Sequence, residues 1–156
     1  MLVIQKLITK MTLNNEIDDS IKKTCFAYLF KILKKKVKED GCSLHFLEGT
    51  KRNINKLLKV AATAETIQWI CAKIQIGLTN LRTSPHTSSN EYEQCRDHTA
   101  FLIKSYTECL RNNRQIFDFA TTTDILCKTA ECTQIIIKSQ AHVLFPLVLE
   151  ELISRQ

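Results

Sequence analysis

Turn-forming residues are scarce in this chain, and their scarcity limits the folds that it can adopt. Its 156 residues include three glycines and two prolines, where average usage would give roughly 19. Sandwiches, barrels and hairpin-rich folds need such residues at many turns, so the count argues against them. It also excludes Gly-rich loops that cradle phosphate groups. Because 44% of the residues are hydrophobic, the chain is expected to fold rather than stay disordered.

Apolar residues recur at helical spacing along most of the chain, which predicts an all-α fold. In residues 20–40 they cover an arc of roughly 200°, so we expect a central helix with neighbours on two sides and one ridge of lysines. Residues 63–81 either form a new helix that starts at Thr63 or continue the helix from near Thr50 as far as Leu81. They carry two apolar stripes, and the second runs through Trp69, Ala72 and Ile76. This pattern again predicts a helix that is covered on two sides.

Polar segments in the middle of the chain predict where helices start and end. Residues 83–89 predict a loop, and Asn90 followed by Glu93 fits a capping box that opens the next helix. Asn112-Asn113 predicts the end of that helix. Further helices are expected over residues 2–13, from near Thr50, and around residues 115–119.

Cap and break signals predict the C-terminal helices. The cluster 121–124 predicts the start of a helix from Ile125 to about Lys138, and Ser139-Gln140 predicts its end. Pro146 predicts the first turn of the last helix. The buried face of that helix is expected to hold Leu147, Val148, Leu149, Leu152 and Ile153. Seven or eight short helices in a single domain over residues 1–156 follow, as an α-solenoid or a compact bundle.

The segment Ala141–Ile153 resembles the start of the second helix of an armadillo repeat, where a small-apolar-Pro sequence turns directly into a Leu-rich helix. Cys109–Ile116, about 35 residues earlier, is similar to the helix exit and Asn-containing turn between such repeats. The resemblance covers roughly residues 95–154 and lacks the usual Gly before the Pro-initiated helix. Residues 1–90 show no matching period. It implies an armadillo/HEAT-like solenoid with a binding groove rather than a catalytic site.

Cysteine usage and the N-terminal residues bear on the compartment. The seven cysteines are odd in number and include no Cys-x-x-Cys pair, so we expect free thiols in the cytoplasm, the nucleus or both. Lys6 interrupts the first apolar run too early for a secretory signal. The acid-free residues 1–15 keep a mitochondrial presequence as an alternative. No apolar run is long enough to span a membrane.

The net charge of +6 is carried by the first third of the chain. Residues 1–60 hold 13 Lys and Arg against 6 Asp and Glu, whereas residues 61–156 hold 9 against 10. One helix side is expected to expose the lysine ridge Lys23, Lys31, Lys34, Lys35 and Lys38. The ridge is interpreted as a solvated helix end, as an import peptide, or as a surface for an acidic partner.

Two Cys-x-x-His pairs, Cys42/His45 and Cys95/His98, have the residue types of a zinc site. The favoured interpretation is core cysteines beside surface histidines, with no metal and no cofactor. No catalytic motif is present, and clustered carboxylates fall at helix ends, where capping explains them.

These patterns predict a non-enzymatic helical adaptor or scaffold that binds a protein partner, an acidic one, through a groove between helices. The candidate contacts are the lysine ridge and Trp69. The alternative is a nucleic-acid-associated subunit that uses the basic ridge of residues 22–38. Scarce arginine and aromatic residues make that alternative weaker.

Overall fold

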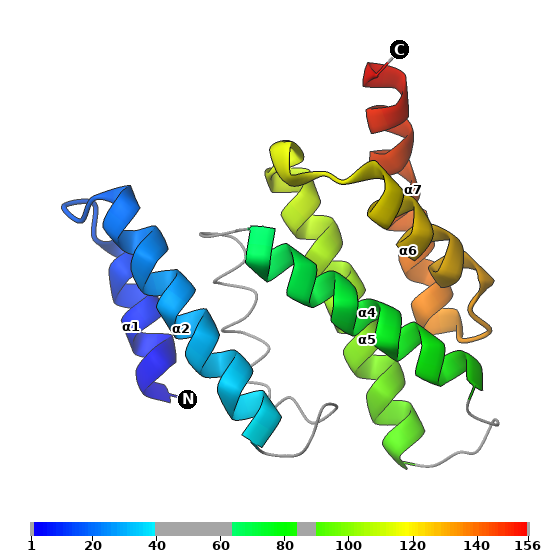
Figure 1. Ribbon diagram of the computed structural model, residues 1–156, viewed down its shortest axis with the longest axis horizontal. Helices are drawn as coiled ribbons and strands as arrows, with labels where there is room; N and C mark the ends of the chain where they lie inside the picture. Colours follow the sequence, from blue (N-terminus) through cyan, green and yellow to red (C-terminus); the bar gives the residue numbers. More distant parts are fainter. Residues whose placement is uncertain (1, 40–63, 84–89, 156) are drawn as a thin grey trace. The chain divides into compact units, whose positions relative to one another are not determined.

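A computed structural model describes residues 2–39, 64–83 and 90–155 (Figure 1). In this part of the chain 89% of the residues are helical, no strand occurs and there are six α-helices, which confirms the all-α class. The helix predicted from near Thr50 and the loop after Thr83 lie outside the described residues. The chain divides into two compact units, Met1–Thr66 and Ile67–Gln156. The single domain over residues 1–156 stays a prediction.

The N-terminal unit contains the helices α1 (Leu2–Leu13) and α2 (Asp19–Glu39), which pack against each other. Both agree with the predicted ranges. In the turn between them, the side chain of Asn14 accepts a hydrogen bond from the backbone N–H of Glu16 at 2.9 Å. On α2, Leu29 is buried, but Ile21, Tyr28 and Ile32 are exposed. The prediction that neighbours cover the whole apolar arc is therefore wrong at these three positions.

The C-terminal unit is built around the helix α5 (Asn90–Asn112), of which eleven residues are buried. α4 (Ala64–Thr83) crosses it, and the 3₁₀ helix η1 (Arg114–Ile116) follows it in the chain. α7 (Ile135–Ser154) packs against both α5 and α6 (Phe119–Glu131). The fully buried apolar side chains of these helices form the core, among them Ile70, Ile74, Leu102, Ile103, Leu110 and Ile125.

α4 and α5 approach each other closely at Gly77. A β-carbon at this position would collide with the buried side chain of Thr99. The thiol of Cys95 also reaches the crossing, with its sulfur 3.9 Å from the Gly77 carbonyl oxygen. The crossing therefore requires a residue without a side chain.

The start of α6 differs from the prediction because Asp118 is its N-cap. The Asp118 carboxylate accepts a hydrogen bond from the backbone N–H of Thr121 at 3.2 Å. The backbone carbonyl of Asp118 accepts another from the Thr122 hydroxyl at 2.7 Å. The threonines therefore lie inside the first turns of the helix instead of preceding it. The predicted range from Ile125 to Lys138 is wrong, since α6 ends at Glu131.

α7 is one continuous helix across two predicted boundaries. It runs through Ser139-Gln140 without a break, and Pro146 lies inside it rather than in its first turn. An interior proline costs about 3 kcal/mol because it removes a hydrogen bond and crowds the carbonyl four residues earlier. Leu144 and Val148, two residues to either side, are buried, so Pro146 and the His142 carbonyl belong to the solvent side. Water can hydrogen-bond to that carbonyl there.

Candidate functional site

The predicted lysine ridge lies on α2. Lys31 and Lys35 are exposed, whereas the side chains of Lys23, Lys34 and Lys38 lie outside the described part of that helix. Lys31 and Lys35 occupy the same helix side, one turn apart. Lys22, on another side of α2, is 9% exposed.

An apolar row runs beside these two lysines. Ile21, Tyr28 and Ile32 are 55%, 66% and 37% exposed, and they are spaced by two turns and by one turn of α2. Lys31 and Lys35 each follow a member of the row by three residues, which places them along one edge of it. We call these five residues the α2 stripe. Sequence reasoning missed it because it expected neighbouring helices to cover the row.

Trp69 is half-buried on α4, and the Lys73 ammonium lies 6.0 Å from the centre of its ring. This i, i+4 pair forms a cation–π contact. Ala72 and Ile76 on the second predicted apolar stripe are exposed, so the prediction that this stripe is covered is wrong at those residues. A role for Trp69 in partner binding stays a prediction.

The Cys95/His98 pair lies on α5 and both side chains are buried. The burial of Cys95 was predicted, but a surface position for His98 is wrong. His98 precedes the buried Leu102 by one turn, so the two side chains lie on the same helix face. Cys42 and His45 lie outside the described residues. In the part that the structure describes, no three His, Cys, Asp or Glu residues are grouped in a way that could hold a metal ion.

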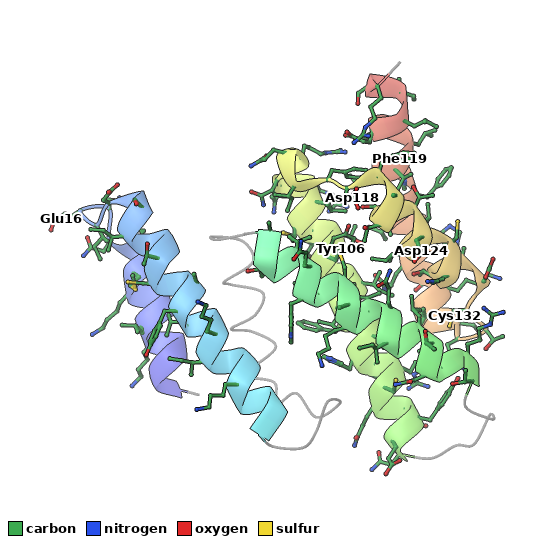
Figure 2. All side chains as sticks on the ribbon, viewed as in Figure 1. Glu16, Tyr106, Asp118, Phe119, Asp124 and Cys132 are labelled. Carbon is green, nitrogen blue, oxygen red and sulfur yellow. The ribbon has the colours of Figure 1, made fainter. Side chains whose placement is uncertain are left out.

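Two buried thiols lie near a buried phenol in the core of the C-terminal unit. The Tyr106 hydroxyl and the Thr122 hydroxyl are 2.7 Å apart. Since Thr122 donates to the Asp118 carbonyl, Tyr106 donates to Thr122. Figure 2 labels Tyr106 and Asp118, the first and last residues of this chain of hydrogen bonds. Burial raises the pKa of Cys71 and of Cys109 to about 11. Such thiols stay protonated near neutral pH, whereas nucleophilic catalysis needs the thiolate. Protonated, buried thiols suit a structural role for Cys71, Cys109 and Tyr106 in the core.

The outer side of α7 carries four exposed apolar side chains. Phe145, Leu149, Leu152 and Ile153 are 53%, 42%, 44% and 62% exposed. Their spacing of i, i+4, i+7 and i+8 places them on one helix face, which we call the α7 face. Leu147 and Val148 are buried as predicted, but the prediction that Leu149, Leu152 and Ile153 are buried with them is wrong.

Contacts on the other sides of α7 hold this face in place. The Arg114 guanidinium from η1 forms an ion pair with Glu150 and lies 3.5 Å from the Leu147 carbonyl oxygen. Near the end of the helix, the Arg155 guanidinium lies 5.4 Å from the centre of the Phe119 ring. The C-terminal turns of α7 are thus braced by η1 and by the start of α6.

A groove with a volume of about 530 Å³ lies between the C-terminal parts of α4 and α6. Leu78 and Leu81 contribute apolar side chains that are themselves buried, and Arg82, Lys128 and Glu131 contribute charges. The Lys128 ammonium is 2.8 Å from the Asp124 carboxylate, so part of the positive charge is neutralised. Lys128 also lowers the pKa of Asp124. The groove combines both signs of charge and indicates no single class of ligand.

No helix among the described residues combines the length and the apolar content needed to cross a lipid bilayer. Comparison with known proteins finds that no protein-family model, no curated protein and no solved structure matches this chain. The armadillo resemblance therefore stays a prediction, and the helix start that it placed at Pro146 lies inside α7.

Proposed function

We propose that this chain is a non-enzymatic helical interaction module that binds a protein partner through the α7 face. The observation that carries the proposal is the row Phe145, Leu149 and Leu152, exposed on a helix whose other sides are braced. Contiguous apolar side chains on a surface mark interaction sites, whereas single ones do not. A row at this spacing matches the apolar side of a partner helix or an apolar groove.

The size of the face favours a transient partner. Burying four side chains that are about half exposed is worth about 3–6 kcal/mol in total. Association costs at least about 4 kcal/mol, so the α7 face alone supports weak binding. A stable dimer buries about 800 Å² per partner, which is more than these four side chains supply. The partner we expect is a short helical segment that adds contacts at the edges of the face.

The test replaces Leu149 and Phe145 by Glu in the full chain and compares the proteins recovered with the wild type and with the variant. Val143→Glu is the matched control, because Val143 is an exposed apolar residue of α7 that lies off the face. We expect the same partners with wild type and Val143→Glu, and their loss with Leu149→Glu and Phe145→Glu at an unchanged melting temperature. Recovery of identical partners by all variants would contradict the proposal.

A further inference from the structure

We infer that α7 pairs antiparallel with α7 of a second copy of this chain. The inference rests on the proposed function and deepens it, because it names the helical segment that covers the α7 face. The pairing surface is a row of exposed residues along the outer side of α7, which we call the α7 seam. Its members are Ile135, Lys138, His142, Phe145, Leu149 and Leu152.

The α7 seam has the spacing of a helix-pairing surface. Its six positions alternate steps of three and four residues along α7, as the a and d positions of a coiled coil do. The seam spans about 26 Å of helix. Three of its members belong to the α7 face, and Ile135 at the other end is 84% exposed. The seam therefore offers a second helix one continuous strip that is longer than the α7 face.

α7 is apolar around its whole circumference, which is unusual for a helix at a surface. Leu144 and Leu147 are buried in the core of the C-terminal unit, whereas Phe145 and Leu149 are exposed in the part of the chain that the structure describes. A helix with apolar residues on all sides is normally covered on all sides. The last turns of α7 project beyond the other helices of this unit (Figure 1), so this end of the seam is open to a second helix.

The outer positions of the seam complement each other when two copies lie antiparallel. In a symmetric pair, each residue meets the position equally far from the middle of the seam. Ile135 of each copy then lies opposite Leu152 of the other, so the two exposed apolar ends cover each other. Lys138 lies opposite Leu149, where its hydrocarbon stem can cover the leucine while its ammonium group reaches water.

The middle of the seam favours the same orientation. In the antiparallel pair the His142 ring lies opposite the Phe145 ring, and the two Lys138 residues are about 16 Å apart along the helix axis. A parallel pair would instead place Lys138 opposite Lys138, and like charges that face each other at an interface are repulsive. A polar residue at a seam position therefore selects the orientation of the pair.

The charge of the C-terminal unit favours a second copy over a strongly acidic or basic partner. This unit holds nine Lys and Arg and nine Asp and Glu, a net charge of zero, and proteins with little net charge associate readily. The whole chain carries +6, so two copies repel each other at long range. Salt screens this repulsion, and the pairing should be as strong or stronger when salt is added.

The seam supports a reversible dimer. Each seam side chain is buried twice, once in each copy, which makes the interface larger than the α7 face alone provides. The contact is still only one helix wide, so it belongs at the small end of specific interfaces. We expect a dissociation constant on the order of 10–100 μM.

Sedimentation equilibrium of the full chain between about 1 and 300 μM tests the dimer. A reducing agent is present so that the exposed Cys127 forms no disulfide between copies. The average mass should rise with concentration from that of one chain towards twice that value. Phe145→Glu should weaken the dimer at least tenfold at an unchanged melting temperature. The matched controls Val143→Glu, on another side of α7, and Tyr28→Glu, on α2, should leave it unchanged.

A pair of charge variants tests the orientation. In the antiparallel pair residue 149 lies opposite Lys138 of the second copy, so Leu149→Glu should dimerise at least three times more tightly than Leu149→Lys. A parallel pair places residue 149 opposite itself, and both variants would then weaken the dimer equally. Val143→Glu and Val143→Lys measure the effect of net charge alone and should differ less than twofold.

Three results would overturn the inference. They are a chain that stays monomeric up to about 300 μM, a Val143→Glu variant that dissociates as much as Phe145→Glu, and equal affinities for Leu149→Glu and Leu149→Lys. The proposed function fails in a different way, since wild type and all α7 variants would then recover identical partners. A monomeric chain that loses its partners in Phe145→Glu would overturn the pairing and support the proposed function.

Discussion

Helices in both units of this protein carry apolar residues at helical spacing, but these residues are buried to different extents in the two units. In the C-terminal unit one apolar stripe of α4 and the stripe of α5 are buried, as at Ile74 and Leu102, although Ile76 on the second stripe of α4 is exposed. Among the side chains that the structure describes in the N-terminal unit, Leu29 is the one apolar side chain that is buried, while Ile21 and Tyr28 are exposed. The net charge is also divided, with +6 in the first unit and zero in the second. Apolar periodicity therefore predicts a helix, but the neighbours available decide whether its stripe becomes core or contact surface.

Substitutions at apolar positions on helices of the two units should differ most in their effect on the free energy of unfolding. Ile74→Ala should lower the free energy of unfolding of the C-terminal unit by about 2–5 kcal/mol, because it removes methyl groups from a fully buried site. Tyr28→Ala should change stability by less than about 0.5 kcal/mol, since its side chain is 66% exposed. Chemical denaturation followed by circular dichroism measures both. A loss above about 2 kcal/mol for Tyr28→Ala would mean that the α2 stripe is covered by the chain itself.

At the crossing of α4 and α5, the question is whether Gly77→Ala stabilises or destabilises the C-terminal unit. At an exposed helix position, replacing Gly by Ala stabilises by about 1 kcal/mol, whereas overpacking a core costs about 1–3 kcal/mol. Because a β-carbon at Gly77 collides with Thr99, Gly77→Ala should destabilise the C-terminal unit by about 1–2 kcal/mol. Adding Thr99→Ala removes the colliding γ atoms and should make the effect of Gly77→Ala smaller. Stabilisation by Gly77→Ala alone, measured as a higher melting temperature, would show that the helices can separate there.

Removing a helix cap should show the smallest difference in stability between the two units. Asp118→Ala should cost about 1 kcal/mol near neutral pH, because it removes the N-cap of α6. Asp18→Ala should cost less, since the Asp18 carboxylate lies 3.5 Å from the Ser20 backbone nitrogen. Hydrogen bonds from Thr121 lower the pKa of Asp118 below its ordinary value of 3.8. A group with a lowered pKa in the folded state stabilises above its ordinary pKa, and this contribution is lost as the pH falls through the lowered value.

Thermal melting between pH 7 and pH 2 checks this behaviour. The difference between wild type and Asp118→Ala should be constant above about pH 5 and shrink below about pH 4. Asp118→Asn keeps a capping oxygen without the charge and should lose most of the pH dependence while retaining part of the stability. A difference that does not change with pH would exclude the carboxylate as the source of the effect.

The sequence predicted helices well where caps and apolar periodicity agree. The ranges of α1, α2, α4 and α5 match within a few residues. The start of α6 was harder to predict from the sequence. The threonines after Asp118 can either precede a helix or occupy its first turn, so they do not mark the first helical residue. Pro146 is tolerated inside α7 because its solvent position lets water satisfy the freed carbonyl, a property that depends on tertiary structure.

Site prediction was limited for a related reason. The lysines and the apolar row of α2 are visible in the sequence, and so is the spacing of Phe145, Leu149 and Leu152. What periodicity cannot show is which of two adjoining apolar sectors contacts a neighbour. On α7 apolar residues surround the helix, so the sequence alone does not divide Leu147 and Val148, which are buried, from Leu149, which is exposed. His98 was misassigned for a simpler reason, since a polar residue one turn from Leu102 still points into the core.

The placement of the cysteines makes the C-terminal unit its own reporter of unfolding. Cys127 is exposed, whereas Cys71, Cys95 and Cys109 are enclosed, and burial raises the pKa of each of these three. A thiol-alkylating reagent at pH 8 therefore reaches Cys127 directly, but it modifies the other three only during openings of the core. Their alkylation rates, read by mass spectrometry, would give the opening frequency of this unit without any engineered label.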